Sequence, residues 1–421
     1  MTATPPPPGR PVRLLGYLAY IGLLTAGYYY NLTFVQLGII DLGTRGVGLN
    51  RGQVSVAMGG LALTAFLVAV ATGMLMDRLR WNVDLPLKLR IVFGVVALQT
   101  VLTLVAPSVG SRPSFVVWVL GCAIVIGVGI PVTFGLMRDF IPVHHRGHVA
   151  AVVAGLAFFA AALYPREWRM GEFAAVLSTA MIPATIVLGV IAFGRFAIVS
   201  ELGRLHELHG PGRFRRPGPE RATPAMFWGL VVLMFAVFFI DSLGFLRIIE
   251  APAYISTSWQ SPDTSVRLFI GISHLVGAVM AGVLYTAFGR RWLIVWVLGL
   301  FAFTHLLYTS HLSSAPSGMD PPLVLPLFYV LAVSFYTTLN FALWPDLSTA
   351  ADIGTRTALG VGIAGWLASF LSTALALYSE NAEVSLLAHL RYVNALALLL
   401  AVGVPVVFYV NRMRSLARSP A

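Results

Sequence analysis

A lone aspartate inside a strongly apolar run is the residue whose type and position most favour chemistry. Asp241 stands in the sequence Phe-Phe-Ile-Asp-Ser-Leu, in the second half of the run Ala225–Leu246. A carboxylate is costly at membrane depth, so it usually faces a cavity or a partner. Two interpretations stay open. Asp241 is either a proton or cation site whose charge changes during a functional cycle, or a carboxylate that a neighbour holds for helix packing.

Three further ionisable residues are candidates for proton coupling. Asp41 and Glu250 follow the same dipeptide, Ile-Ile, near the ends of the first and seventh apolar runs. This repeat predicts a latch at one membrane face, although two separate pairs, Asp41 with Arg45 and Glu250 with Arg247, would give the same pattern. His274 in the eighth run either exchanges protons near neutral pH or is a packed neutral side chain.

Amide and aromatic side chains recur at helical spacing in two of the apolar runs. Residues spaced by seven and four lie on one face of a helix. The members of the two series are Tyr20, Gly27, Asn31 and Gly38, and Tyr329, Tyr336, Asn340 and Trp344. Either these side chains bind a solute or the amides hold helices together. The candidate solute-binding residues are Tyr28, Asn31, Asp241, Tyr336, Asn340 and Trp344.

A short charged segment follows the second apolar run and returns later in the chain. It begins at Gly73, continues Met-Leu-Met, and ends with Asp77-Arg78-Leu-Arg80. A second copy starts 209 residues later at Gly282 and ends with Gly289, Arg290 and Arg291, with Thr286 and Ala287 where the first copy has Asp77 and Arg78. At an offset of 207, Asp139, Gly147 and Gly155 correspond to Asp346, Gly354 and Gly362. We therefore expect two parallel repeats, a pattern found in one class of secondary transporters.

Membrane-spanning helices must position these residues. Of the 421 residues, 58% are hydrophobic and 11% are charged, whereas a soluble domain carries roughly 25% charged residues. We interpret twelve apolar runs as spans. They are Leu14–Ile40, Val54–Met76, Ile91–Ala106, Phe115–Leu136, Val149–Leu163, Phe173–Phe193, Ala225–Leu246, Leu268–Phe288, Trp292–Tyr308, Leu323–Leu343, Ala358–Tyr378 and Tyr392–Val410.

The composition also argues against several classes of protein. The net charge of +11 comes from short loops between spans, so we expect no nucleic-acid binding. The single cysteine, Cys122, cannot form a disulfide framework. The only lysine, Lys88, follows no glycine-rich run, so no nucleotide-binding P-loop is present in the sequence. The histidines of 144–148 and 206–209 lack the ligands or spacing of a zinc site. We expect no cofactor and no bound metal.

The two charged segments resemble the loop signature of the major facilitator superfamily (MFS). That signature runs glycine, three residues, Asp-Arg, one residue, then Gly-Arg-Arg or Gly-Arg-Lys. The segment from Asp139 to Gly147 also looks like the family's junction between spans four and five. The resemblance implies a twelve-helix membrane fold in two six-helix halves, with spans one, four, seven and ten around a central cavity. It also implies a cytoplasmic gate, made here by Gly73, Asp77, Arg78, Gly282, Gly289, Arg290 and Arg291, that holds an outward-open state.

The predicted topology has both termini in the cytoplasm. With that orientation, inner loops and tails hold 20 of the 28 lysine and arginine residues, as the positive-inside rule requires. The predicted divisions are a disordered cytoplasmic tail (1–13), an N-terminal half (14–199), a cytoplasmic linker (200–223), a C-terminal half (224–411) and a C-terminal cytoplasmic tail (412–421).

The predicted function is transport of a small solute across the plasma membrane by alternating access. A neutral or cationic organic solute fits better than an anion, because no arginine lies within the predicted cavity spans. Protons are the candidate coupling ion, and we expect a monomer in the lipid bilayer. The alternative is a transporter-like membrane sensor or assembly factor that binds a ligand without moving it. We expect no enzyme, because no cluster of acid, base and nucleophile appears near one membrane face.

Overall fold

The computed structural model describes residues 10–164, 169–194, 196–197, 199–203, 223–314, 321–349 and 351–418, with side chains up to residue 406. The predicted N-terminal tail and linker therefore lie mostly outside the described residues. In the described ranges, every regular element is a helix. Those ranges include eleven helices that are long and apolar enough to cross a membrane. The run from Arg10 to Gly46 is helical throughout and supplies the twelfth element of the predicted all-helical membrane fold.

The first half begins with one continuous helical run, made of α1 (Arg10–Tyr29), the π-helix η1 (Tyr30–Leu37), α2 (Gly38–Asp41) and the π-helix η2 (Leu42–Gly46). Its other long helices are α3 (Arg51–Arg78), α4 (Leu85–Val105), α5 (Arg112–Phe140), α6 (Arg146–Leu163) and α7 (Met170–Phe193). The second half consists of α9 (Pro224–Glu250), α10 (Thr264–Val283) with η7 (Leu284–Phe288), α11 (Arg290–Ser314), α12 (Val324–Asp346), a continuous run of α13 (Ile353–Thr357), η8 (Ala358–Leu367) and α14 (Ala368–Asn381), and α15 (Leu386–Arg418).

Most helices begin before the apolar runs that predicted them, and at α3, α4, α5, α9 and α10 a polar side chain caps the start. The third span was predicted from Ile91, but α4 starts at Leu85, where the Asp84 carboxylate accepts the Leu87 N–H at 2.9 Å. Likewise, Asn50 and Gln53 form a reciprocal capping box at the start of α3. Such caps satisfy backbone donors that have no partner within the helix.

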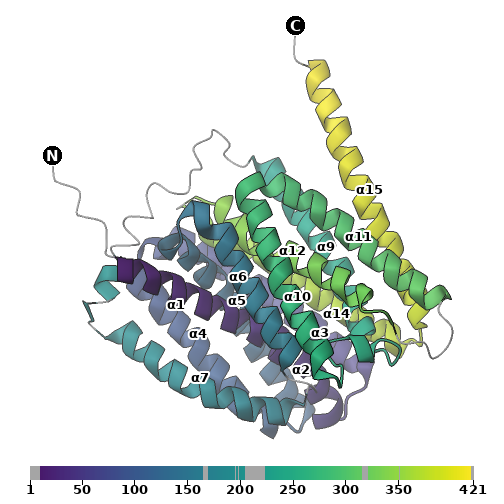
Figure 1. The fold of residues 1–421 in the computed structure, drawn as a ribbon. Coiled ribbons are helices and arrows are strands. Elements are labelled where there is room, and N and C mark those ends of the chain that lie inside the picture. The colour runs from purple at the N-terminus through teal and green to yellow at the C-terminus, as the bar shows by residue number, and fades with distance from the viewer. Residues whose placement is uncertain are drawn as a thin grey trace.

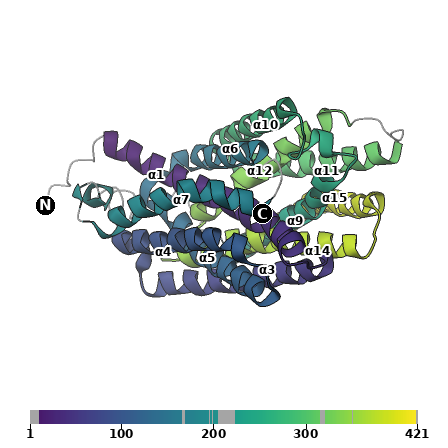
Figure 2. The ribbon, with the colours of Figure 1, turned by 90° about the horizontal axis from the view of Figure 1, so that it is seen from below.

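The two halves meet along two pairs of helices. Figures 1 and 2 show α6 beside α10, and α3 beside α14. Each of these two contacts includes a close approach of two glycines, with Gly354 on α13, at the start of the run that continues into α14. A Cβ atom on Gly354 would lie 2.6 Å from the Gly73 carbonyl oxygen, and one on Gly282 would lie 3.1 Å from the Gly147 carbonyl oxygen. The predicted repeats match Gly73 with Gly282, and Gly147 with Gly354. In the structure these glycines contact crosswise, Gly73 against Gly354 and Gly282 against Gly147.

The directions of the helices define two ends of the bundle. We call them the Asp77 end, where α3 finishes, and the Arg51 end, where α3 begins. The described chain starts at the Asp77 end with α1 and returns there with α15, whose last turns project beyond the bundle in Figure 1.

Candidate functional site

A cavity lies between the two halves near the middle of the bundle. Tyr28, Leu32, Gln36 and Phe158 line it from the first half. The second half contributes Phe238, Asp241, Ser242, Phe245, Trp259, Tyr329, Val333, Tyr336, Asn340, Phe341, Val361, Gly365, Trp366 and Ser369. The cavity itself is small, about 40 Å³, which is room for a few water molecules, so in this closed state an organic solute would have to move the surrounding side chains apart. Bulky rings keep it narrow.

The cavity contains one carboxylate, that of Asp241 on α9. The residue is 3% exposed. Two hydroxyl groups from α12 donate hydrogen bonds to its Oδ2 atom, Tyr336 at 2.6 Å and Tyr329 at 3.0 Å. These tyrosines are seven residues apart, which places both on the same face of α12. The structure therefore brings together three residues from the sequence analysis, on two facing helices.

A histidine stands behind this carboxylate. His305 on α11 is 2% exposed, and its Nε2 atom is 3.9 Å from Asp241 Oδ1. Neither ring nitrogen has a hydrogen-bond partner within the described residues. The sequence analysis did not select His305, because its only signal was that of a histidine in an apolar run. Protonation of His305 would place a positive charge beside Asp241, so these two residues form a candidate titrating pair.

Nine aromatic rings line the cavity, and we call them the aromatic wall: Tyr28, Phe158, Phe238, Phe245, Trp259, Tyr329, Tyr336, Phe341 and Trp366. Many of these rings contact one another and form a continuous series in space. Tyr28 contacts Trp366 and Phe158, with ring centroids 5.5 and 5.6 Å apart. Phe245 contacts Trp259 at 5.1 Å and Tyr329 at 5.8 Å. The wall therefore continues from the first half to the hydroxyl groups around Asp241.

Two π-helical segments face the cavity from opposite halves. η1 contributes Leu32 and Gln36, and η8 contributes Val361, Gly365 and Trp366. Segments of π-helix are rare and often mark functional sites. Gln36 donates a hydrogen bond from Nε2 to Thr373 Oγ1 at 2.9 Å, which joins the halves, while its Oε1 atom has no hydrogen-bond partner among the described residues.

Trp259 reaches the cavity from the loop 251–263. In this loop, the Tyr254 hydroxyl donates to the Tyr308 carbonyl oxygen at 3.2 Å. Burial raises the pKa of Tyr254 to about 12, so its hydroxyl keeps its proton near neutral pH and holds the loop against α11.

The other predicted solute-binding residues have different positions. Asn340 lines the cavity, but Asn31 and Trp344 lie outside the lining. The Trp344 Nε1–H donates to Asn340 Oδ1 at 2.7 Å. The Trp344 ring packs directly against Gly360, where any Cβ atom would overlap it. Trp344 therefore fixes the orientation of the Asn340 amide from outside the cavity lining.

The remaining candidates for proton coupling lie away from Asp241. His274 is fully buried one layer behind the cavity, stacked on Phe158 and hydrogen-bonded to Ser334 Oγ at 3.0 Å. Asp41 pairs with Arg45 at 3.2 Å and accepts the Met170 N–H at 2.7 Å, both within the first half.

Glu250 makes a contact that the sequence analysis missed. It pairs with Arg51 of the first half at 3.1 Å, and Glu380 lies 3.8 Å from the same arginine. Arg247, the other proposed partner of Glu250, donates instead to the Val384 carbonyl oxygen at 3.0 Å. At the Arg51 end, a single arginine thus links α3 to the ends of α9 and α14.

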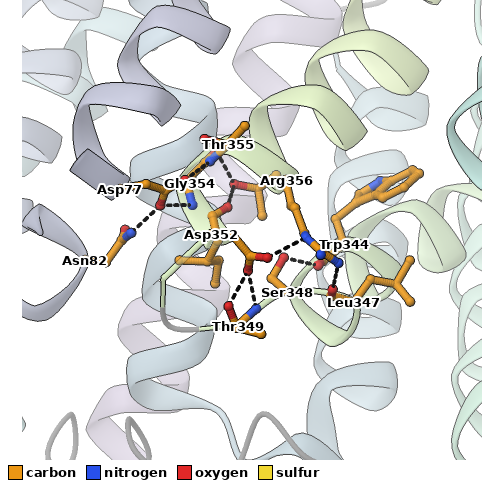
Figure 3. A network of polar contacts seen from close by, with 12 residues as sticks. Asp77, Asn82, Trp344, Leu347, Ser348, Thr349, Asp352, Gly354, Thr355 and Arg356 are labelled. Carbon is orange, nitrogen blue, oxygen red and sulfur yellow. Dashed lines mark hydrogen bonds and ion pairs between the residues drawn. The ribbon is translucent and has the colours of Figure 1, made fainter. Parts of the chain in front are cut away.

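At the Asp77 end, a carboxylate from one half caps a helix of the other. Asp77 accepts the N–H groups of Gly354 at 2.9 Å and Thr355 at 2.7 Å, both at the start of α13 (Figure 3). The Asn82 amide also donates to Asp77 at 2.5 Å. A carboxylate at a helix N-terminus is favoured by the free N–H groups and by the helix dipole.

Two further pairs support this end. The Arg146 guanidinium contacts the Asp346 carboxylate at 3.2 Å and bridges the halves, and the Tyr285 hydroxyl donates to the same carboxylate at 2.6 Å. Within the first half, the buried Lys88 ammonium pairs with Asp139 and donates to the Asn82 carbonyl oxygen. Arg146, Asp346 and Lys88 were not among the predicted gate residues.

The predicted gate residues divide into two groups. Gly73, Asp77 and Gly282 lie at contacts between the halves. Arg78 and Arg291 are exposed, and the Arg290 guanidinium lies 3.7 Å from Met226 Sδ in the second half. Gly289 has a φ angle of +86°, a backbone conformation that favours glycine, at the turn before α11.

Comparisons with known structures identify the fold. The chain resembles the MFS proton:xylose symporter XylE, with a TM-score of 0.59 and 17% identity over 93% of this chain and 94% of that one. It also resembles the human organic anion transporter MFSD10, with a TM-score of 0.58 and 14% identity over 94% and 99% of the two chains. A bacterial homologue of the iron transporter ferroportin gives a TM-score of 0.55 and 15% identity over 92% and 97%. No family model and no curated protein matches the sequence.

Proposed function

We propose that this chain, which has the MFS fold, is a secondary transporter that moves a small organic solute by alternating access. The observation that carries the proposal is the central cavity between two halves that touch at both ends. Asp77 and Arg146 join the halves at one end, and Arg51 joins them at the other. A central site closed at both ends is what an occluded intermediate requires.

Alternating access would follow from breaking one set of contacts at a time. Loss of the Asp77 bonds to α13 and of the Arg146–Asp346 pair would free the Asp77 end, while Arg51, Glu250 and Glu380 keep the other end closed. A bound solute or proton shifts this equilibrium only as far as it binds the two states differently. We propose that the Asp77 end faces the cytoplasm, since most lysine and arginine residues lie in its loops and tails.

Proton coupling is proposed for Asp241. Its neighbours are the two tyrosine hydroxyls of α12 and the His305 ring of α11. A carboxylate in this setting changes its charge at moderate cost if the halves rearrange around it. Asp41, Glu250 and His274 remain secondary candidates for coupling. We propose that the protein acts as a monomer in the plasma membrane.

The test is reconstitution of the full chain in liposomes with a trapped pH indicator. Pools of metabolites are applied outside, and the wild type is compared with Asp241→Asn and with Glu172→Gln, an exposed carboxylate on α7 that serves as the matched control. We expect saturable proton movement with one pool in the wild type and the control, and none in Asp241→Asn. Flux that survives in Asp241→Asn would contradict the coupling role. Ligand binding without uptake of any labelled solute would favour the sensor or assembly factor.

A further inference from the structure

The cavity lining has one charge and no compensating cation. Asp241 is its only carboxylate, and none of its residues is a lysine, arginine or histidine. The nearest basic group, His305, lies behind the carboxylate on α11 and is not part of the lining. An anionic solute would therefore meet an uncompensated carboxylate at short range, in surroundings where charges are weakly screened.

The polar groups of the site leave acceptors available. Both tyrosine hydroxyls donate to the Oδ2 atom of Asp241, so its Oδ1 atom receives neither of them. The Gln36 Oε1 atom belongs to a side chain of the lining and has no hydrogen-bond partner among the described residues, but its surface is covered in this closed state. Available acceptors match a solute that carries N–H groups or a positive charge.

The aromatic wall supplies nine of the eighteen residues that line the cavity. The face of an aromatic ring carries partial negative charge and attracts ammonium groups, most strongly when water is excluded. Rings from both halves participate, since Tyr28 and Phe158 belong to the first half and Trp366 to the second. Apart from Asp241 and the polar atoms of the three tyrosines and two tryptophans, the lining supplies four polar side chains, Gln36, Ser242, Asn340 and Ser369.

We propose that the central site binds an organic ammonium cation with an apolar body, with Asp241 as its counter-ion and the aromatic wall around it. This inference rests on the proposed function and narrows its solute class. The binding step is non-covalent: the cation exchanges its hydration shell for the carboxylate and the rings, and no bond is formed or broken.

The test is equilibrium binding to the purified full chain by calorimetry. The probes are three cations of increasing size, tetraethylammonium, benzyltrimethylammonium and tetraphenylphosphonium, with benzoate and benzyl alcohol as the anionic and neutral comparisons. We expect at least one cation to bind with an affinity that falls about tenfold or more in Asp241→Asn and is unchanged in Glu172→Gln. Benzoate and benzyl alcohol should neither bind nor compete.

A second pair of variants separates the rings from general packing. Trp366→Phe keeps an aromatic face in the cavity and should retain binding, whereas Trp366→Leu should weaken the cation several-fold. Equal losses in the two variants would contradict the role of the rings. Binding of benzoate tighter than of every cation, or no Asp241-dependent binding of any of the three, would overturn the proposal.

The liposome assay keeps the two proposals distinguishable. Saturable uptake of a neutral or anionic solute, without cation binding, would overturn the ammonium site and leave the transporter intact. Asp241-dependent cation binding without any uptake would support the ammonium site and contradict transport.

Discussion

At the scale of single residues, the two hydroxyl groups on Asp241 are the contacts most open to test. We expect Tyr336→Phe to lower the thermal stability of the purified protein, because the bond of 2.6 Å satisfies a buried carboxylate oxygen and loss of such a bond costs about 1–3 kcal/mol. The matched control is Tyr20→Phe, since Tyr20 is equally buried but its hydroxyl has no hydrogen-bond partner among the described residues. Equal stability of the two variants, measured by thermal unfolding, would refute the contribution of Tyr336.

Lys88 gives a second prediction at this scale. It is fully buried, and its ammonium group pairs with Asp139, which is fully buried too. Lys88→Met removes the ammonium group that pairs with the buried Asp139 carboxylate, which we expect to destabilise the protein by about 3–5 kcal/mol. The double variant Lys88→Met with Asp139→Leu removes both charges and should recover most of that loss. Thermal unfolding of the single and double variants checks this, and a double variant no better than the single one would contradict it.

At the scale of helices, the crossed glycines set how closely the halves approach. We expect Gly354→Ala to prevent full closure of α3 against α13, because the new methyl group would lie 2.6 Å from a backbone carbonyl oxygen that cannot move aside. Gly59→Ala, on the same α3 at a position with nothing within 4 Å of its Cβ, is the control. Overpacking of this kind costs about 1–3 kcal/mol. Distances between spin labels on α3 and α13 should lengthen in Gly354→Ala alone.

At the scale of the whole molecule, the two ends are expected to oppose each other. Asp77→Asn weakens the cap on α13 and should shift the population toward opening of the Asp77 end, whereas Arg51→Gln should shift it toward opening of the other end. Double electron–electron resonance between labels on the two halves, placed at each end, reads both shifts. The combined variant should lie between the two single ones. Identical distance distributions in wild type and Asp77→Asn would remove Asp77 from the gate.

The sequence predicted the fold because apolar runs of membrane length and a repeat of 209 residues are local or periodic signals. It also selected Asp241 and Tyr336, since a charge in an apolar run and a series of period seven are visible without a structure. Arg51, His305 and Gln36 were missed, because their roles depend on which helices face each other across the interface. Trp344 belongs to the same series of spacings of seven and four as Tyr336. Its ring nevertheless packs outside the cavity, because Gly360 on η8 has no side chain to exclude it.

The chain also has an unusual chemical background for labelling. Its only lysine and its only cysteine, Lys88 and Cys122, are both buried, at 0% and 1% exposure. A thiol introduced on the surface would therefore be the single accessible site for a maleimide dye, without prior removal of the native cysteine. Acylation of Lys88 by an amine-reactive ester, identified at that residue by mass spectrometry, would likewise report exposure of the buried Lys88–Asp139 pair.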